Sequence, residues 1–147
     1  MNEIKQEYIE QLVFLVDEML KHYKEYQTDM SALYPQGITS NELTIIQFVH
    51  LNPDIVIKEV SEALSIPGST LTSAIDRLEQ KNLLIRTVSK KNRRSFGLKL
   101  TQEGIRLNAE HEKAERQVWH KILSKLGNDE DRELLIKLIT TIVNKLD

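Results

Sequence analysis

Apolar residues recur every three or four positions over residues 4–34, at the start of the chain. These positions are Ile4, Tyr8, Ile9, Leu12, Val13, Val16, Met19, Leu20 and Tyr23. The spacing predicts one long helix with a single broad apolar stripe. Pro35 and Gly37 then break the chain and end this helix.

A second helix is predicted from Ser40 to about Leu51, before Asn52 and Pro53. Its start carries the capping-box pattern, in which the Thr39 hydroxyl and the Glu42 carboxylate each bond the other's unpaired backbone N–H.

Residues 57–81 read as two short amphipathic helices around a tight turn at 65–68, a helix-turn-helix arrangement. Ser69 is suited to cap the second helix. Leu71, Ile75 and Leu78 recur on one side of that helix and predict its buried face. The other positions are polar and rich in hydroxyl groups, namely Thr70, Thr72, Ser73, Asp76, Arg77 and Gln80.

The period changes after Asn82, and residues 84–100 predict a two-stranded hairpin with a basic turn. A helix-turn-helix followed by such a hairpin, or wing, is a winged helix. Thr101 opens a further helix that stops near Gly127, and Asn128 opens a final helix that continues through Leu146. The predicted fold is therefore mainly α-helical with a small β-hairpin.

The helices at 1–36 and 102–147 exceed what the winged-helix lobe at 39–101 needs, so we expect one domain in which they form the dimerisation region. Both are apolar on wide stripes, and packing them together and against a second copy would bury those stripes. A twofold dimer would place two recognition helices about one DNA turn apart and predicts a palindromic operator. Packing within one chain alone is the simpler alternative.

Charge becomes informative when it is counted by segment. The 147 residues contain 20 Lys and Arg against 22 Asp and Glu, a net charge of −2 that argues against a nucleic-acid partner. Residues 69–101, however, contain eight bases and two acids, a net charge of +6. Five bases and no acid lie between Arg86 and Arg94. This run favours a phosphate-binding surface over an ordinary solvated charged face.

The predicted DNA-binding residues fall into two groups. On the second helix they are Ser69, Thr70, Thr72, Ser73 and Arg77, and on the wing they are Lys90, Lys91, Arg93 and Arg94. Short hydroxyl side chains and an arginine fork suit base edges and phosphates in the major groove. Arginine also suits a narrow minor groove, which favours Arg93 or Arg94 for insertion. The alternatives are hydroxyls that merely cap a surface helix and lysines that protect a hairpin edge from aggregation.

Four stretches of the chain carry a resemblance, namely residues 57–64, 69–86, Asn92-Arg93-Arg94 and 100–104. In this order they resemble the MarR family of bacterial transcriptional regulators. With the flanking helices, the resemblance covers essentially the whole chain. It implies a triangular obligate dimer built from the N- and C-terminal helices, with two winged-helix lobes on a palindrome. It also implies a repressor that a small ligand releases.

The chain departs from the family pattern at three positions. Asn92 stands where the wing usually carries an Asp, so we expect a looser or more positive wing. Ser73 stands where a base is common, which removes one DNA contact. Asn82 replaces a Gly, a mild change because Asn also tolerates a left-handed backbone.

The effector implied by the resemblance is amphipathic or phenolic and would sit between the dimerisation helices and the winged helix. Leu15, Met19, Phe48 and Trp119 are candidate wall residues, although ordinary core packing is favoured for each. No ligand site is therefore assigned.

We expect neither a cofactor nor a metal site. The chain has no Cys, and the pair of His111 with Glu115, four positions later, is by itself weak evidence for a metal site. No glycine-rich phosphate loop or nucleophile elbow indicates an enzyme. The start of the chain lacks the pattern of a signal peptide and no apolar run is long enough to span a membrane, so we expect no membrane partner and a cytoplasmic location.

The sequence predicts binding, not turnover: a dimeric regulator of transcription that binds double-stranded DNA. The alternative is a winged-helix module whose basic hairpin binds an acidic protein. Weak, sequence-independent DNA binding would distinguish such a module from a regulator.

Overall fold

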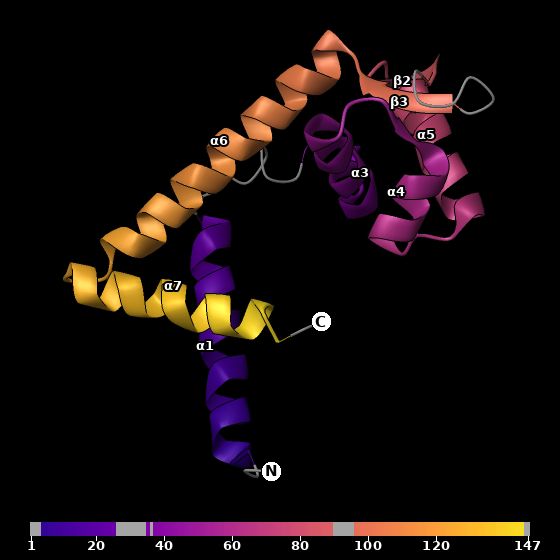
Figure 1. The fold of residues 1–147 in the computed structure, drawn as a ribbon. Helices are drawn as coiled ribbons and strands as arrows, with labels where there is room; N and C mark the ends of the chain where they lie inside the picture. The colour runs from indigo at the N-terminus through magenta and orange to yellow at the C-terminus, as the bar shows by residue number, and fades with distance from the viewer. Residues whose placement is uncertain (1–3, 26–34, 36, 90–95, 146–147) are drawn as a thin grey trace.

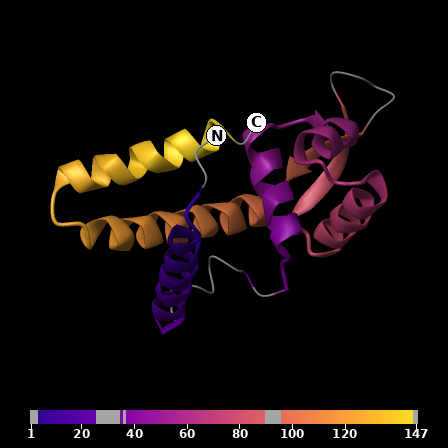
Figure 2. The same cartoon turned by 90° about the horizontal axis from the view of Figure 1, so that it is seen from below.

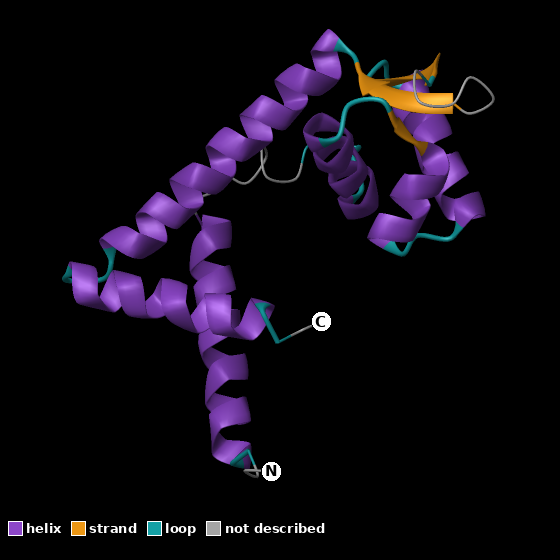
Figure 3. Ribbon diagram, viewed as in Figure 1, coloured by secondary structure: helices purple, strands orange, loops and turns teal. Residues whose placement is uncertain are grey.

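The computed structural model describes residues 4–25, 35, 37–89 and 96–145, which form six helices and a three-stranded sheet. Figures 1 and 3 show the arrangement. The helices are α1 (Gln6–Glu25), α3 (Ser40–Leu51), α4 (Ile57–Leu64), α5 (Gly68–Gln80), α6 (Gln102–Ser124) and α7 (Asp129–Val143). The strands are β1 (Ile55–Val56), β2 (Leu84–Val88) and β3 (Phe96–Leu100). The prediction of a mainly α-helical fold with a small wing is confirmed.

A compact lobe is built from α3, α4, α5 and the sheet (Figure 3). The sheet is antiparallel with strand order β1-β3-β2, and Arg86 of β2 lies opposite Leu98 of β3. The lobe core consists of aliphatic side chains from every one of these elements. Those that are fully buried include Ile45, Ile46, Val60, Leu71, Ile75, Leu84 and Leu98.

The remaining helices extend away from this lobe. α6 leaves the end of β3 as a long helix, and α7 turns back beside it as a helical hairpin (Figure 2). α1 crosses α7 in the view of Figure 1, but Figure 2 shows that the two helices lie apart. No helix in the described part of the chain is long and apolar enough to cross a membrane.

The junction between the lobe and α6 is tightly packed. Thr101 caps α6 by accepting a hydrogen bond from the Gly104 N–H (3.0 Å), and its hydroxyl donates to the Asn82 carbonyl (2.6 Å). A Cβ atom at Gly104 would collide with the Leu83 carbonyl, so only glycine fits there. The backbone of Asn82 adopts the left-handed conformation, with φ of 54°, as expected for an Asn in place of Gly. These contacts fix the direction in which α6 leaves the lobe.

Local helix signals predicted most boundaries correctly. α3 begins after Thr39 with both bonds of the capping box in place, and Asn128 caps α7 by accepting from the Asp131 N–H. The two-strand prediction for the sheet was incomplete, because β1 adds to it through only two residues paired with β3. So short a strand leaves no alternating pattern to read in the sequence.

Two predicted boundaries were wrong. Ser69 does not cap α5, because the helix begins at Gly68 with Pro67 at the cap position. Proline supplies a fixed φ there and no side-chain acceptor. α6 ends at Ser124 and not near Gly127, with Lys125 at its C-cap. The second part of the predicted first helix, residues 26–34, lies outside the described residues.

Candidate nucleic-acid interface

One side of α5 is buried in the lobe and the other is exposed and polar. Leu71, Ala74, Ile75 and Leu78 form the buried side. We call the exposed set the polar face of α5, and it consists of Ser69, Thr70, Thr72, Ser73, Asp76, Arg77 and Gln80. All five of the residues that the sequence analysis selected on this helix belong to that face. The structure therefore brings them together on one surface.

Two hydroxyls of the polar face already donate their hydrogens within the helix. Thr72 Oγ1 donates to the Gly68 carbonyl (2.8 Å), and Ser73 Oγ donates to the Ser69 carbonyl (3.0 Å). In this state each oxygen still offers lone pairs to an external donor. The exposed amino groups of adenine and cytosine in the major groove are donors of this kind.

Arg77 of the polar face is held from inside the lobe by Glu42, a contact that sequence reasoning missed. Arg77 Nε donates to Glu42 Oε1 at 2.7 Å, although the two residues are 35 positions apart in the sequence. The Glu42 side chain is fully buried, whereas the Arg77 side chain is 49% exposed. Arg77 thus joins the buried base of α3 to the exposed surface of α5.

The second carboxylate oxygen of Glu42 is also fully engaged. Oε2 accepts from the Thr39 N–H (2.9 Å) and lies 3.2 Å from Lys81 Nζ, which also donates to the Gly37 carbonyl. Burial by itself raises the pKa of Glu42, but the Thr39 N–H, Arg77 and Lys81 outweigh it and lower the pKa to about 2.

Arg86 makes a second set of ion pairs, and this corrects the interpretation of the basic run. Arg86 Nη2 lies 2.6 Å from Asp76 Oδ1, Nη1 pairs with Glu79, and the Arg86 backbone N–H donates to Glu79 Oε1 at 2.9 Å. Arg86 therefore neutralises two acids of α5 and ties β2 to that helix. It belongs to the scaffold of the lobe and not to a phosphate-binding run.

The basic wing residues Lys90, Lys91, Arg93 and Arg94 lie outside the described residues, as does Asn92. The strands that lead to them, β2 and β3, are paired from Leu84 with Leu100 to Val88 with Phe96. The two strands of the predicted hairpin are thus present, and the DNA-contact role of the four bases stays a prediction.

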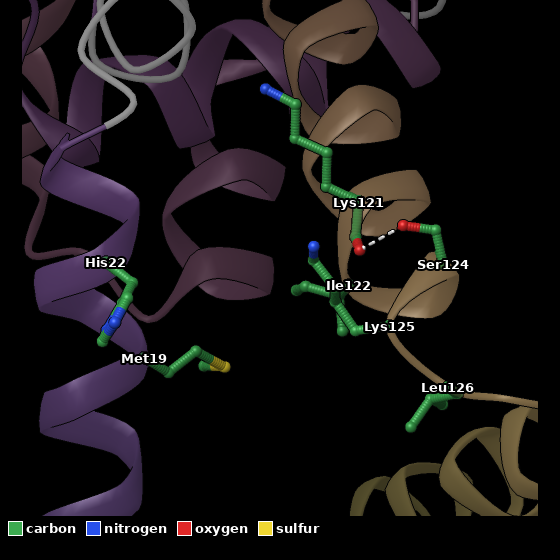
Figure 4. A pocket seen from close by; sticks show the side chains of 7 residues that line it. All are labelled: Met19, His22, Lys121, Ile122, Ser124, Lys125 and Leu126. Carbon is green, nitrogen blue, oxygen red and sulfur yellow. Dashed lines mark hydrogen bonds between the residues drawn. The ribbon is translucent and has the colours of Figure 1, made fainter.

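The four candidate effector-wall residues do not meet in one site. Phe48 packs against the lobe core, whereas Leu15, Met19 and Trp119 are 59%, 43% and 49% exposed. These three side chains are therefore not part of a core within one chain: α1 leaves Leu15 and Met19 exposed, and Trp119 borders an open hollow with Leu135, Ile136 and Ile139 of α7. Met19 instead borders an open pocket of about 660 Å³ between α1 and α6 (Figure 4).

No group of three or more His, Cys, Asp or Glu side chains able to hold a metal occurs among the described residues. His111 is buried and its Nε2 lies 3.4 Å from Glu115. The pair noticed in the sequence is thus a single contact on one helix.

A model of the MarR family matches residues 36–95, which contain α3, α4, α5 and β2. Over these residues the chain is similar to the MarR family. The chain is 34% identical over 83 residues to the HTH-type transcriptional repressor MdtR of Bacillus subtilis, a match covering 56% of this chain and 54% of that protein. It spans about half the length of the curated relatives it matches first.

Solved structures share the fold of this chain over nearly its whole length. YusO from Bacillus subtilis superimposes with a TM-score of 0.71 at 24% identity, covering 97% of this chain and 99% of that one. Streptococcus pneumoniae FabT, solved in complex with DNA, gives a TM-score of 0.77 at 22% identity, covering 95% and 96%. The likeness extends to the helices outside the 36–95 match.

Proposed function

We propose that this chain is a MarR-family regulator of transcription, a dimeric and sequence-specific DNA-binding protein in which α5 enters the major groove and the wing contacts the flanking backbone. The observation that carries the proposal is the polar face of α5. Short hydroxyl side chains and an arginine project from a helix whose opposite side is locked into the lobe core. Such a helix reads base edges in winged-helix proteins.

The flanking helices support the dimeric form. α1 exposes a continuous set of apolar side chains, from Tyr8 and Ile9 to Met19 and Leu20, each at least 43% exposed. No residue of α7 is buried, and its exposed apolar side chains are Leu134, Ile136, Leu138, Ile139, Ile142 and Val143. An apolar surface of this extent marks an association site. A second copy would cover it and set two α5 helices on one duplex.

The finer features follow from the family and the symmetry. A twofold dimer reads a palindrome. A small amphipathic or phenolic effector that binds best to a dimer with a different distance between its two lobes would release the protein from DNA. MdtR of Bacillus subtilis bears the name of a repressor. We propose repression as the mode of this protein as well.

The test is selection of duplexes from a random DNA pool by the purified protein, followed by affinity against salt concentration. Enrichment of a palindrome and a steep fall of log K with log salt are expected, about 0.9 per neutralised phosphate. Replacing Lys90 or Lys91 by Ala is expected to reduce that slope by about 1 without changing the selected sequence. Enrichment of no sequence would instead favour the protein-interaction module.

A further inference from the structure

We infer that Glu42 is a positioning residue for DNA recognition. It accepts a hydrogen bond from one edge of the Arg77 guanidinium inside the lobe and so orients the other edge toward the duplex. The inference rests on the proposed function, because it specifies how a DNA-contacting side chain is oriented before DNA arrives.

The geometry of Arg77 divides its guanidinium into two parts. Nε is bonded to the buried carboxylate at 2.7 Å, while none of the described residues bonds either of its Nη atoms. The side chain is 49% exposed, so the Nη edge has access to the surface of α5. Two parallel Nη donors are the atoms with which arginine grips a phosphate or the O6 and N7 atoms of guanine.

Glu42 is itself rigidly held, and this makes it an effective anchor. Its other oxygen is fixed by the Thr39 N–H and Lys81, and its side chain is fully buried beneath α5. A free arginine loses much rotamer freedom when it binds, and a tether present before binding reduces that loss. The anchor also fixes α5 to the first turn of α3, which follows the segment leading from α1.

Glu42→Gln separates positioning from capping. Glutamine supports a capping box as glutamate does. An amide, however, has one acceptor oxygen and cannot serve the Thr39 N–H and Arg77 Nε together. The matched control is Glu59→Gln at the start of α4, where the carboxylate accepts the Val56 N–H (3.1 Å) in the same way and pairs with no described base.

The experiment measures affinity for two duplexes: the best sequence selected by the wild-type protein from a random pool, and a scrambled duplex of equal length. We expect Glu42→Gln to weaken the selected complex about tenfold, equivalent to about 1.4 kcal/mol. Affinity for the scrambled duplex should change less than about twofold. The salt slope should stay the same, because the number of phosphate contacts does not change. Glu59→Gln should leave both affinities near wild type.

A double-mutant cycle with Arg77→Lys tests whether Glu42 acts through Arg77. Lysine keeps a charge for Glu42 but has no second edge to present, so Glu42→Gln should have no further effect in that background. An equal loss in both backgrounds, an equal loss on both duplexes, or an unchanged selected complex would overturn the inference. If Glu42→Gln does not fold, Glu42→Asp, one methylene shorter, replaces it in the same cycle. If the wild-type protein selects no sequence, the proposed function has failed before any variant is made, and this inference falls with it.

Discussion

The lobe and the flanking helices carry similar amounts of apolar sequence but bury it very differently. In the lobe, Ile45, Ile46, Leu71 and Leu98 are fully buried and polar pairs cross-link neighbouring elements. In α1 and α7 the apolar stripes are exposed. The difference shows that an apolar stripe predicts burial without stating whether the partner lies in the same chain. The lobe completes its core alone, and we propose that the flanking helices need a second copy.

The largest effect is expected in the lobe core. Leu98 lies at the centre of the sheet, fully buried, so Leu98→Ala should lower the free energy of unfolding by roughly 2–5 kcal/mol through lost burial and a cavity. Chemical denaturation of the purified protein measures this. Leu51→Ala, at a side chain that is 76% exposed, is the matched control and should change stability by less than about 0.5 kcal/mol.

Acid should weaken the lobe through Glu42. Its folded-state pKa, about 2, lies below the ordinary value of 4.5, so its stabilisation is complete above pH 4.5 and is lost as the pH falls toward 2. The difference corresponds to roughly 3 kcal/mol. Unfolding free energy measured between pH 2 and pH 6 should show this loss in the wild-type protein, whereas Glu42→Gln should be less stable at pH 6 and lack this part of the slope. Parallel pH profiles would contradict the assignment.

A charge on the exposed apolar stripe of α7 should weaken the dimer while leaving the fold of the lobe intact. Leu138 is 54% exposed, so Leu138→Asp costs a folded monomer little, but in a dimer it would bury an unpaired carboxylate. We expect the dimer dissociation constant to rise at least about tenfold, near 1.4 kcal/mol, in analytical ultracentrifugation. Lys137→Asp, one position away on a polar site, is the control. A stable dimer in the Leu138→Asp variant would place the interface elsewhere.

The smallest effect is expected at Arg86, which sharpens the distinction between scaffold and DNA-binding charge. Its partner Asp76 is half exposed, so solvent screens the pair and Arg86→Gln should cost about 1 kcal/mol of stability. Since Arg86 neutralises acids of α5, the salt slope of DNA binding should stay the same, while Lys90→Ala reduces it. If Arg86→Gln lowers the salt slope of DNA binding by about 1, Arg86 does contact a phosphate.

Features that depend on neighbouring positions in the sequence were predictable. The Thr39 capping box, the Thr101 cap and the buried face of α5 each arise from residues three or four positions apart, and all three are confirmed. The start of α5 was misassigned to Ser69 because Pro67 also begins helices well and the sequence offers both signals. The two residues of β1 were missed because their pairing partner in β3 lies more than 40 positions away.

The sequence by itself determined which segments are helical, which side of each is apolar and where the hydroxyl-rich helix lies, because helix periodicity and capping act over one turn. Only the tertiary structure decided what the charges do. It placed Glu42 beneath Arg77 and set Arg86 between Asp76 and Glu79. A count of charges cannot reveal such pairs, since Coulombic attraction acts through space and burial strengthens it only after packing has excluded water.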